Sequence, residues 1–301
     1  LLASIVSFVE SDKSIVYTSC TMIRETALPD QFLHQYTVNF NSLDPVDTCA
    51  LSNGESVYLP NPTYATSVQR YDRFIRYRED TYMWMVKICH SKGYNPNVAY
   101  VGMNYFDRYL SLVYVDRRRI ELLSWCCLHL ASVAVDTRSN CLSINQIAKA
   151  VDDTFTIRSI TQMIEEILCI LQFALYPSSP YSIGKQILCE SGNEILLSRF
   201  YYLLDGVCMN YSSIRYCPKS IAYTCLLVVW FYSFEDKSLP SSLTVCLDVY
   251  LADALGILSI VKDSFPMLNN ACHLAETELS YKRCFSCCSP KIGRASCRER
   301  V

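Results

Sequence analysis

Glycine is scarce in this chain, with 8 residues among 301. Rossmann folds and P-loops need glycines at fixed offsets, because only glycine lets the backbone approach a phosphate closely. Neither G-x-G-x-x-G nor G-x-x-x-x-G-K-[ST] occurs in the sequence. These absences argue against the common nucleotide-binding folds. Long segments with helical apolar spacing favour an all-α chain instead.

Histidine and net charge are also low, with four histidines and a formal charge of −2. The chain has no global attraction for nucleic acid and no basic stripe, so we expect no nucleic-acid partner. The single C-x-x-C pair, Cys284 and Cys287, has no histidine close by, so we expect no metal and no cofactor. Hydrophobic residues make up 51% of the chain, enough to bury the core of one large domain or two ordinary ones.

Cysteine is abundant, at 17 residues, so an extracellular disulfide scaffold is the first alternative. The chain is long for such a scaffold and its cysteines are scattered. Several lie inside apolar helical patterns, including Cys126, Cys127, Cys169 and Cys225. Buried free thiols behave as small hydrophobic side chains. We therefore expect reduced cysteines and an intracellular protein.

The most apolar segment, residues 221–234, is shorter than the roughly 20 residues that a membrane span needs. We interpret it as a buried helix and expect no membrane association. The chain begins with Leu1 and has no positively charged leader, so we expect a fragment rather than a signal peptide. Residues 292–301 look like the translation of a sequencing adapter and are left out of the fold prediction.

Apolar spacing and Pro/Gly breaks predict two successive groups of five helices. Residues 1–63 are expected to form an irregular leader, residues 64–177 a first bundle, residues 178–265 a second bundle and residues 266–291 a tail. The expected helices lie near residues 72–89, 95–113, 117–135, 143–151 and 157–175, then 181–190, 194–210, 218–234, 241–254 and 255–265. The third helix of each group is the most apolar, which predicts that it is central.

Two segments of the first bundle are specific. Residues 78–88 place Arg78 six residues before Trp84 in the frame R-E-D-x-x-x-W, and residues 103–111 read MNYFDRYLS. Together they resemble the opening of the cyclin box, and the R-E-D-x-x-x-W form is most similar to plant D-type cyclins. Residues 129–132, HLAS, resemble the L-L-A-S of the family's third helix, and residues 162–175 resemble its fifth. The resemblance implies two tandem five-helix cyclin-box bundles.

In the family, residues matching Arg78 and Asp107 pair inside the box. A charge stranded in a core costs about 3–5 kcal/mol, so we expect these two side chains to form a buried bidentate ion pair. This pair would be scaffold and not a catalytic site. Trp84, Tyr105 and Leu110 are expected in the core around it.

The resemblance also implies a surface that binds a cyclin-dependent protein kinase. The positions that match this surface are Leu130, Val133, Asp136, Glu165 and Phe173. Val133 stands where the family has a lysine. The family's glutamate position falls on Ile164, and Glu165 follows it. The implied function is kinase regulation in cell-cycle or developmental control, with kinase substrates or inhibitors as possible further partners. A nuclear, and also cytoplasmic, location is expected.

Three alternatives remain open at this point. A degenerate cyclin would bind a partner without activating a kinase, which the valine at position 133 favours. A transcription-factor-like cyclin fold would contact DNA or polymerase. An enzyme is the third, although no Ser-His-Asp or Cys-His spacing suggests a nucleophile, and we predict no catalytic residue.

Overall fold

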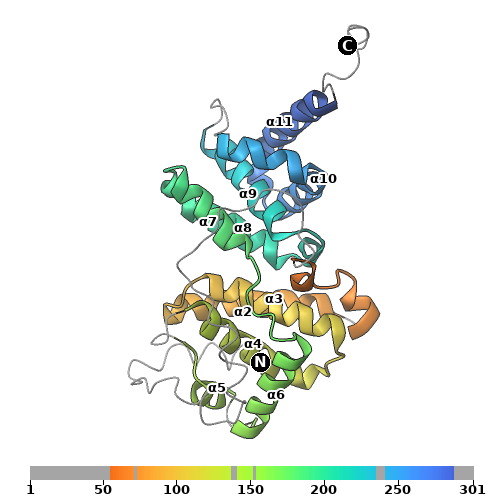
Figure 1. Ribbon diagram of the computed structural model, residues 1–301, viewed down its shortest axis with the longest axis vertical. Helices are drawn as coiled ribbons and strands as arrows, with labels where there is room; N and C mark the ends of the chain where they lie inside the picture. The colour runs from red at the N-terminus through yellow and green to blue at the C-terminus, as the bar shows by residue number, and fades with distance from the viewer. Residues whose placement is uncertain (1–54, 71–72, 137–140, 152–153, 235–240, 288–301) are drawn as a thin grey trace.

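The computed structural model describes residues 55–70, 73–136, 141–151, 154–234 and 241–287 (Figure 1). Within these ranges the chain is helical and has no β-strand, as predicted. Most of the expected leader, residues 1–54, and the suspected adapter translation, residues 292–301, lie outside the described residues.

The first group of helices occupies the lower part of Figure 1. It comprises η2 (Glu55–Tyr58), η3 (Ala65–Gln69), α2 (Phe74–Lys92), α3 (Asn97–Leu112), η4 (Arg117–Arg119), α4 (Ile120–Val135), α5 (Ile144–Ala150) and α6 (Ile157–Ile170). Helix α4 is the central element, because it packs against both α3 and α6 and is buried along most of its length. This agrees with the apolar pattern of its sequence.

Local signals explain where several of these helices begin and end. Gly93 follows α2 with φ of 67°, and His90 and Lys92 lie in the last turn, where cations interact favourably with the helix dipole. Ser143 and Gln146 form a capping box at the start of α5. The hydroxyl of Thr156 accepts a hydrogen bond from the backbone of Ser159 and caps α6.

Helix α6 is shorter than the sequence predicted. The expected helix ran to residue 175, but α6 ends at Ile170. Gln172 and Phe173 then adopt left-handed backbone conformations, with φ of 52° and 57°. Such angles cannot continue a right-handed helix. The segment after α6 therefore turns away, and the sequence offers no glycine there to signal it.

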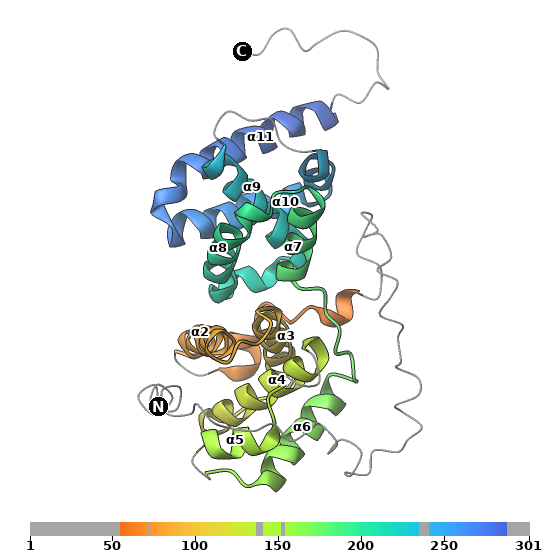
Figure 2. The ribbon, with the colours of Figure 1, turned by 90° about the vertical axis from the view of Figure 1, so that its left-hand side faces the viewer.

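The second group of helices lies above the first in Figures 1 and 2. It comprises α7 (Pro180–Glu190), η6 (Glu194–Leu196), α8 (Leu197–Met209), η7 (Tyr211–Arg215), α9 (Pro218–Ser233), α10 (Ser241–Ser264), η8 (Pro266–Leu268) and α11 (Asn269–Cys287). Helix α9 packs against α7, α8, α10 and α11, so the most apolar helix is again central.

Two expectations for this second group were wrong. The break expected between residues 254 and 255 does not exist, because α10 runs unbroken from Ser241 to Ser264. Gly256 lies within this helix, where it leaves room for the Tyr216 side chain. A Cβ added at Gly256 would lie 2.0 Å from the Tyr216 hydroxyl oxygen. The expected tail, residues 266–291, contains α11, which packs on α9 and α10.

The predicted core residues lie inside the first group. Tyr105 and Leu110 are fully buried and Trp84 is 7% exposed. The ring of Trp84 meets that of Trp125 edge to face, with centroids 4.6 Å apart. Among the described cysteines none is in a disulfide, and most are buried, although Cys169 is exposed. No described helix combines the length and apolarity of a membrane span.

Candidate functional site

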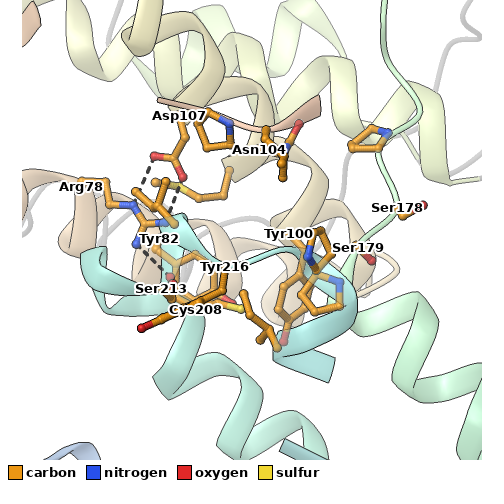
Figure 3. A pocket seen from close by; sticks show the side chains of 18 residues that line it. Arg78, Tyr82, Tyr100, Asn104, Asp107, Ser178, Ser179, Cys208, Ser213 and Tyr216 are labelled. Carbon is orange, nitrogen blue, oxygen red and sulfur yellow. Dashed lines mark hydrogen bonds and ion pairs between the residues drawn. The ribbon is translucent and has the colours of Figure 1, made fainter. Parts of the chain in front are cut away.

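The ion pair expected between Arg78 and Asp107 is present, and it joins α2 to α3 (Figure 3). Nη2 of Arg78 lies 2.9 Å from Oδ2 of Asp107, and Nε lies 3.2 Å from Oδ1. The two side chains are 4% and 6% exposed. Burial, the largest single effect, disfavours the charged guanidinium, but the charge and hydrogen bond of Asp107, with smaller contributions from Tyr64 and Cys208, together raise the pKa of Arg78.

The pair belongs to a larger network that the sequence did not reveal. The hydroxyl of Tyr64 donates to Oδ1 of Asp107 over 2.6 Å. Nη1 of Arg78 donates to the carbonyl oxygens of Cys208 and Met209, at 2.8 and 2.7 Å. These carbonyls end α8, where helix carbonyls lack intrahelical partners. Arg78 therefore caps a helix of the second group and holds the two groups together.

A second polar contact between the two groups centres on Asp205 of α8. Its Oδ1 accepts hydrogen bonds from Tyr82 of α2, at 3.1 Å, and from Tyr100 of α3, at 2.5 Å. Burial raises the pKa of the Asp205 carboxyl, and the two hydroxyl donors partly oppose that rise. Tyr100 in turn packs against Tyr181 of α7, with ring centroids 5.4 Å apart.

A cleft of about 90 Å³ lies along this seam (Figure 3). It is lined by residues of both groups, among them Arg78, Tyr82, Tyr100, Ser179 and Tyr216. Small-molecule sites usually enclose about 300–1,000 Å³. The Ser179 hydroxyl is directed at the Asn97 amide oxygen and not into free space. The cleft is a packing seam, and its lining contains no pairing of a nucleophile with a base.

The residues expected to bind a kinase lie on α4, on α6 and just after them, and these two helices pack side by side. Leu130 on α4 is 7% exposed, while Val133 and Asp136 near its end are half-buried. Glu165 on α6 is exposed and Phe173, in the turn after α6, is half-buried. Oδ2 of Asp136 accepts a hydrogen bond from the Asn95 backbone at 3.0 Å.

The two glutamates of α6 have different surroundings. Glu166 accepts a hydrogen bond from the Tyr109 hydroxyl and pairs with Arg119 at 3.1 Å. Each residue turns a helix by about 100°. Ile164 is therefore buried against the bundle while Glu165 is exposed. Glu165 is the carboxylate that α6 leaves available to a partner.

Two polar side chains of α4 hydrogen-bond to the backbone of Leu142, just before α5. Nδ1 of His129 lies 2.6 Å from the Leu142 carbonyl oxygen, and the Ser132 hydroxyl accepts from the Leu142 backbone at 3.0 Å. Burial lowers the pKa of His129, and the bond to the Leu142 carbonyl partly opposes this. The neutral imidazole donates to that carbonyl. Sequence analysis assigned no role to His129, which stands where the family has an apolar residue.

Comparison with protein families matches residues 47–176 to the family described as Cyclin, N-terminal domain. The match includes Arg78, Asp107 and every residue expected at the kinase-binding surface. It begins upstream of residue 64, where the first bundle was expected to start.

The chain is similar to curated cyclins at low identity. Putative cyclin-F3-2 of Oryza sativa subsp. japonica is 26% identical over 209 residues, which are 67% of this chain and 50% of that protein. G1/S-specific cyclin-D1 of Danio rerio is 34% identical over 83 residues, which are 28% of each chain. Other relatives are named as A-, B- and D-type cyclins. The chain thus spans half or less of the length of these two relatives.

Among solved structures, a viral cyclin from herpesvirus saimiri is similar, with a TM-score of 0.53 and 15% identity. The likeness covers 64% of this chain and 86% of the viral one. Together with the helical architecture, it shows the all-α cyclin-box fold.

Proposed function

We propose that this chain is a regulatory subunit in cell-cycle or developmental control that binds a cyclin-dependent protein kinase through α4 and α6. The observation that carries the proposal is the match of residues 47–176 to the cyclin N-terminal domain. The buried Arg78–Asp107 pair supports it, because the cyclin-box resemblance implied this pair and because it joins α2 to α3, the helix on which α4 packs.

The proposed face consists of Leu130, Val133, Asp136, Glu165 and Phe173. An apolar centre with a polar rim is the usual composition of a protein-binding surface. The helices beneath it are held in place by side-chain contacts, including the part-buried Glu166–Tyr109 and the buried His129–Leu142 hydrogen bonds. Such a preorganised face would act by binding the active arrangement of a kinase more tightly than the inactive one, which shifts the population. The subunit itself carries out no catalysis and needs no cofactor.

We propose more specifically that the chain is a D-type cyclin. The R-E-D-x-x-x-W frame at Arg78 and the 34% identity with a D-type cyclin support it. We also propose a nuclear location, as expected of a cell-cycle regulator.

A second candidate is a degenerate cyclin that binds its partner without activating it. Val133 favours this reading, because an apolar side chain stands where the family places a lysine. A valine cannot donate a hydrogen bond or contribute a charge to a kinase. The two candidates share a binding face and differ in its consequence.

The experiment that separates them is a pull-down from cell extract followed by a kinase assay. The wild-type chain, Val133→Lys and the control Arg158→Lys, an exposed residue of α6, are compared. Retention of an active kinase by the wild type supports the regulatory subunit. Retention of a kinase without activity that Val133→Lys then restores supports the degenerate cyclin. Retention of no kinase by any of the three contradicts both.

A further inference from the structure

Four exposed arginines lie on segments of the first group of helices that side-chain contacts join. Arg70 follows η3, Arg73 precedes α2, and Arg117 and Arg118 form part of η4. We call these four residues the arginine surface. They are separate from the five residues proposed to bind a kinase.

Buried contacts bring the two arginine-bearing segments together. Gln69 is fully buried, and its Nε2 donates to the carbonyls of Leu110 and Val113, at 2.7 and 2.8 Å. Its Oε1 accepts from the Val115 backbone at 3.1 Å. One side chain thus fixes the end of η3, next to Arg70, against the turn that leads to Arg117.

A second contact completes the arrangement. The guanidinium carbon of Arg117 lies 4.7 Å from the ring centroid of Tyr77, a cation–π geometry. Tyr77 lies in the first turn of α2, and Arg73 precedes that helix with a left-handed backbone, φ of 64°. The backbone N–H of Tyr77 donates to the Arg73 carbonyl at 3.2 Å. The Arg117 side chain is therefore held over a ring in the first turn of α2, four residues after Arg73 in the chain.

In the part of the chain that the structure describes, none of the four guanidinium groups pairs with a carboxylate. The described acidic residues nearest to them in sequence are Asp116, whose Oδ1 accepts from the Arg118 backbone, and Glu121, four residues after Arg117. Asp72, between Arg70 and Arg73, lies outside the described residues. Exposed Leu112 and Tyr114 flank the arginines.

We propose that the arginine surface binds an acidic segment of another protein, with apolar side chains of that segment on Leu112 and Tyr114. Charge complementarity identifies the occupant, because guanidinium groups pair bidentately with carboxylates and phosphates. The apolar flank favours a protein over a nucleic acid. This binding is independent of the proposed kinase contact, since the two surfaces share no residue.

The test measures fluorescence anisotropy of a short labelled peptide in which glutamates alternate with leucine and serine. The full chain is expected to bind this peptide. It is not expected to bind a second peptide in which glutamine replaces each glutamate. Raising salt from about 0.1 M to about 1 M shortens the screening length from about 10 Å to about 3 Å and should abolish binding. The double variant Arg73→Glu/Arg117→Glu should weaken peptide binding about tenfold or more. Each exposed arginine–glutamate ion pair contributes a factor of about two to five in affinity, and reversing the charge of the arginine adds repulsion.

Matched variants separate a binding role from a structural one. Arg158→Glu, which reverses an exposed charge on α6, should leave peptide affinity unchanged. Tyr77→Phe keeps the ring beneath Arg117 and should retain affinity, whereas Tyr77→Ala should lower it. All variants should keep the wild-type melting temperature, and the double variant should still retain a kinase in the pull-down above.

Three outcomes would overturn the proposal. The first is equal binding of the glutamate and glutamine peptides. The second is an affinity that the double variant does not change while its fold is intact. The third is a single-stranded oligonucleotide of equal charge that binds more tightly than the peptide and depends on the same arginines.

Discussion

The Tyr64 hydroxyl donates to Asp107 across 43 residues of sequence, and it reaches the same carboxylate oxygen as Nε of Arg78. The segment that precedes α2 therefore contributes a side chain to the ion-pair site. Burial, followed by the Asp107 charge, raises the pKa of Tyr64, so this hydroxyl remains a donor throughout the physiological range.

Removing one partner of this site should destabilise the protein in a graded way. Asp107→Ala strands the Arg78 charge in the core and should cost about 3–5 kcal/mol of unfolding free energy. Tyr64→Phe removes one hydrogen bond and should cost about 1–3 kcal/mol. Urea denaturation measures both. Glu165→Gln, an exposed carboxylate, is the control and should stay within about 0.5 kcal/mol of wild type. An Asp107→Ala protein as stable as that control would show that the Arg78–Asp107 pair does not stabilise the fold.

Two helical glycines should respond oppositely to alanine. At Gly184 in α7 an added Cβ would lie 2.1 Å from Cζ of Phe200, a fully buried ring. Overpacking of this kind costs about 1–3 kcal/mol. At Gly102 in α3 the nearest atoms lie 3.5 Å away, an ordinary contact, and alanine gains about 1 kcal/mol of helix propensity.

Thermal unfolding of the two glycine variants checks this pair directly. Gly184→Ala should melt below the wild type, and Gly102→Ala should melt at or above it. The reverse order would mean that α7 and α8 are not packed as described.

His129 should make stability depend on pH. Burial lowers its pKa below the ordinary 6.5, so the unfolded chain binds more protons here than the folded one. The stability that neutral His129 contributes is fully present above its unfolded-state pKa of about 6.5. It is lost as the pH falls through the lower pKa of the folded state. Denaturation midpoints measured from about pH 7.5 to 5 should fall less steeply for His129→Gln than for wild type. A parallel fall for wild type and His129→Gln would contradict the assignment.

Asp205 should show the opposite pH dependence. Burial raises its pKa above 3.8, so its contribution to stability is present below the unfolded-state pKa and is lost as the pH rises through the folded-state value. Asp205→Asn keeps an oxygen that can accept from Tyr82 and Tyr100 without burying a charge. At about pH 7 this variant should be at least as stable as wild type, and its advantage should shrink at about pH 3.5. A loss of more than about 1 kcal/mol at neutral pH would show that the charge itself is required.

The sequence predicted the features that depend on local pattern and on the motifs. Apolar spacing located α4 and α9 as the central helices, and the resemblance to the cyclin box, together with the need to compensate a buried charge, led from Arg78 to Asp107. The contacts between the two groups could not be predicted in this way. Tyr64 and Asp205 are ordinary polar residues in the sequence. Only tertiary packing brings Tyr64 to Asp107, and Asp205 of α8 to Tyr82 and Tyr100.

Breaks in the helices were the weakest predictions, for a physical reason. Gly256 is accommodated within α10 because it makes room for the Tyr216 hydroxyl, although glycine usually signals an end. Gln172 and Phe173 end the helical path in a left-handed conformation that few residues of their type adopt. Tertiary packing decides both cases, and a single sequence does not contain that information.

Site-specific photo-crosslinking tests the proposed kinase contact most directly. A photoreactive amino acid is placed at Glu165, at the centre of the exposed side of α6, or at Ile195, which is 83% exposed in the second group. Each protein is then mixed with a cyclin-dependent kinase. The account predicts a crosslinked product from position 165 and none from position 195. Crosslinking from position 195 alone, or from neither position while the kinase is retained, would contradict it.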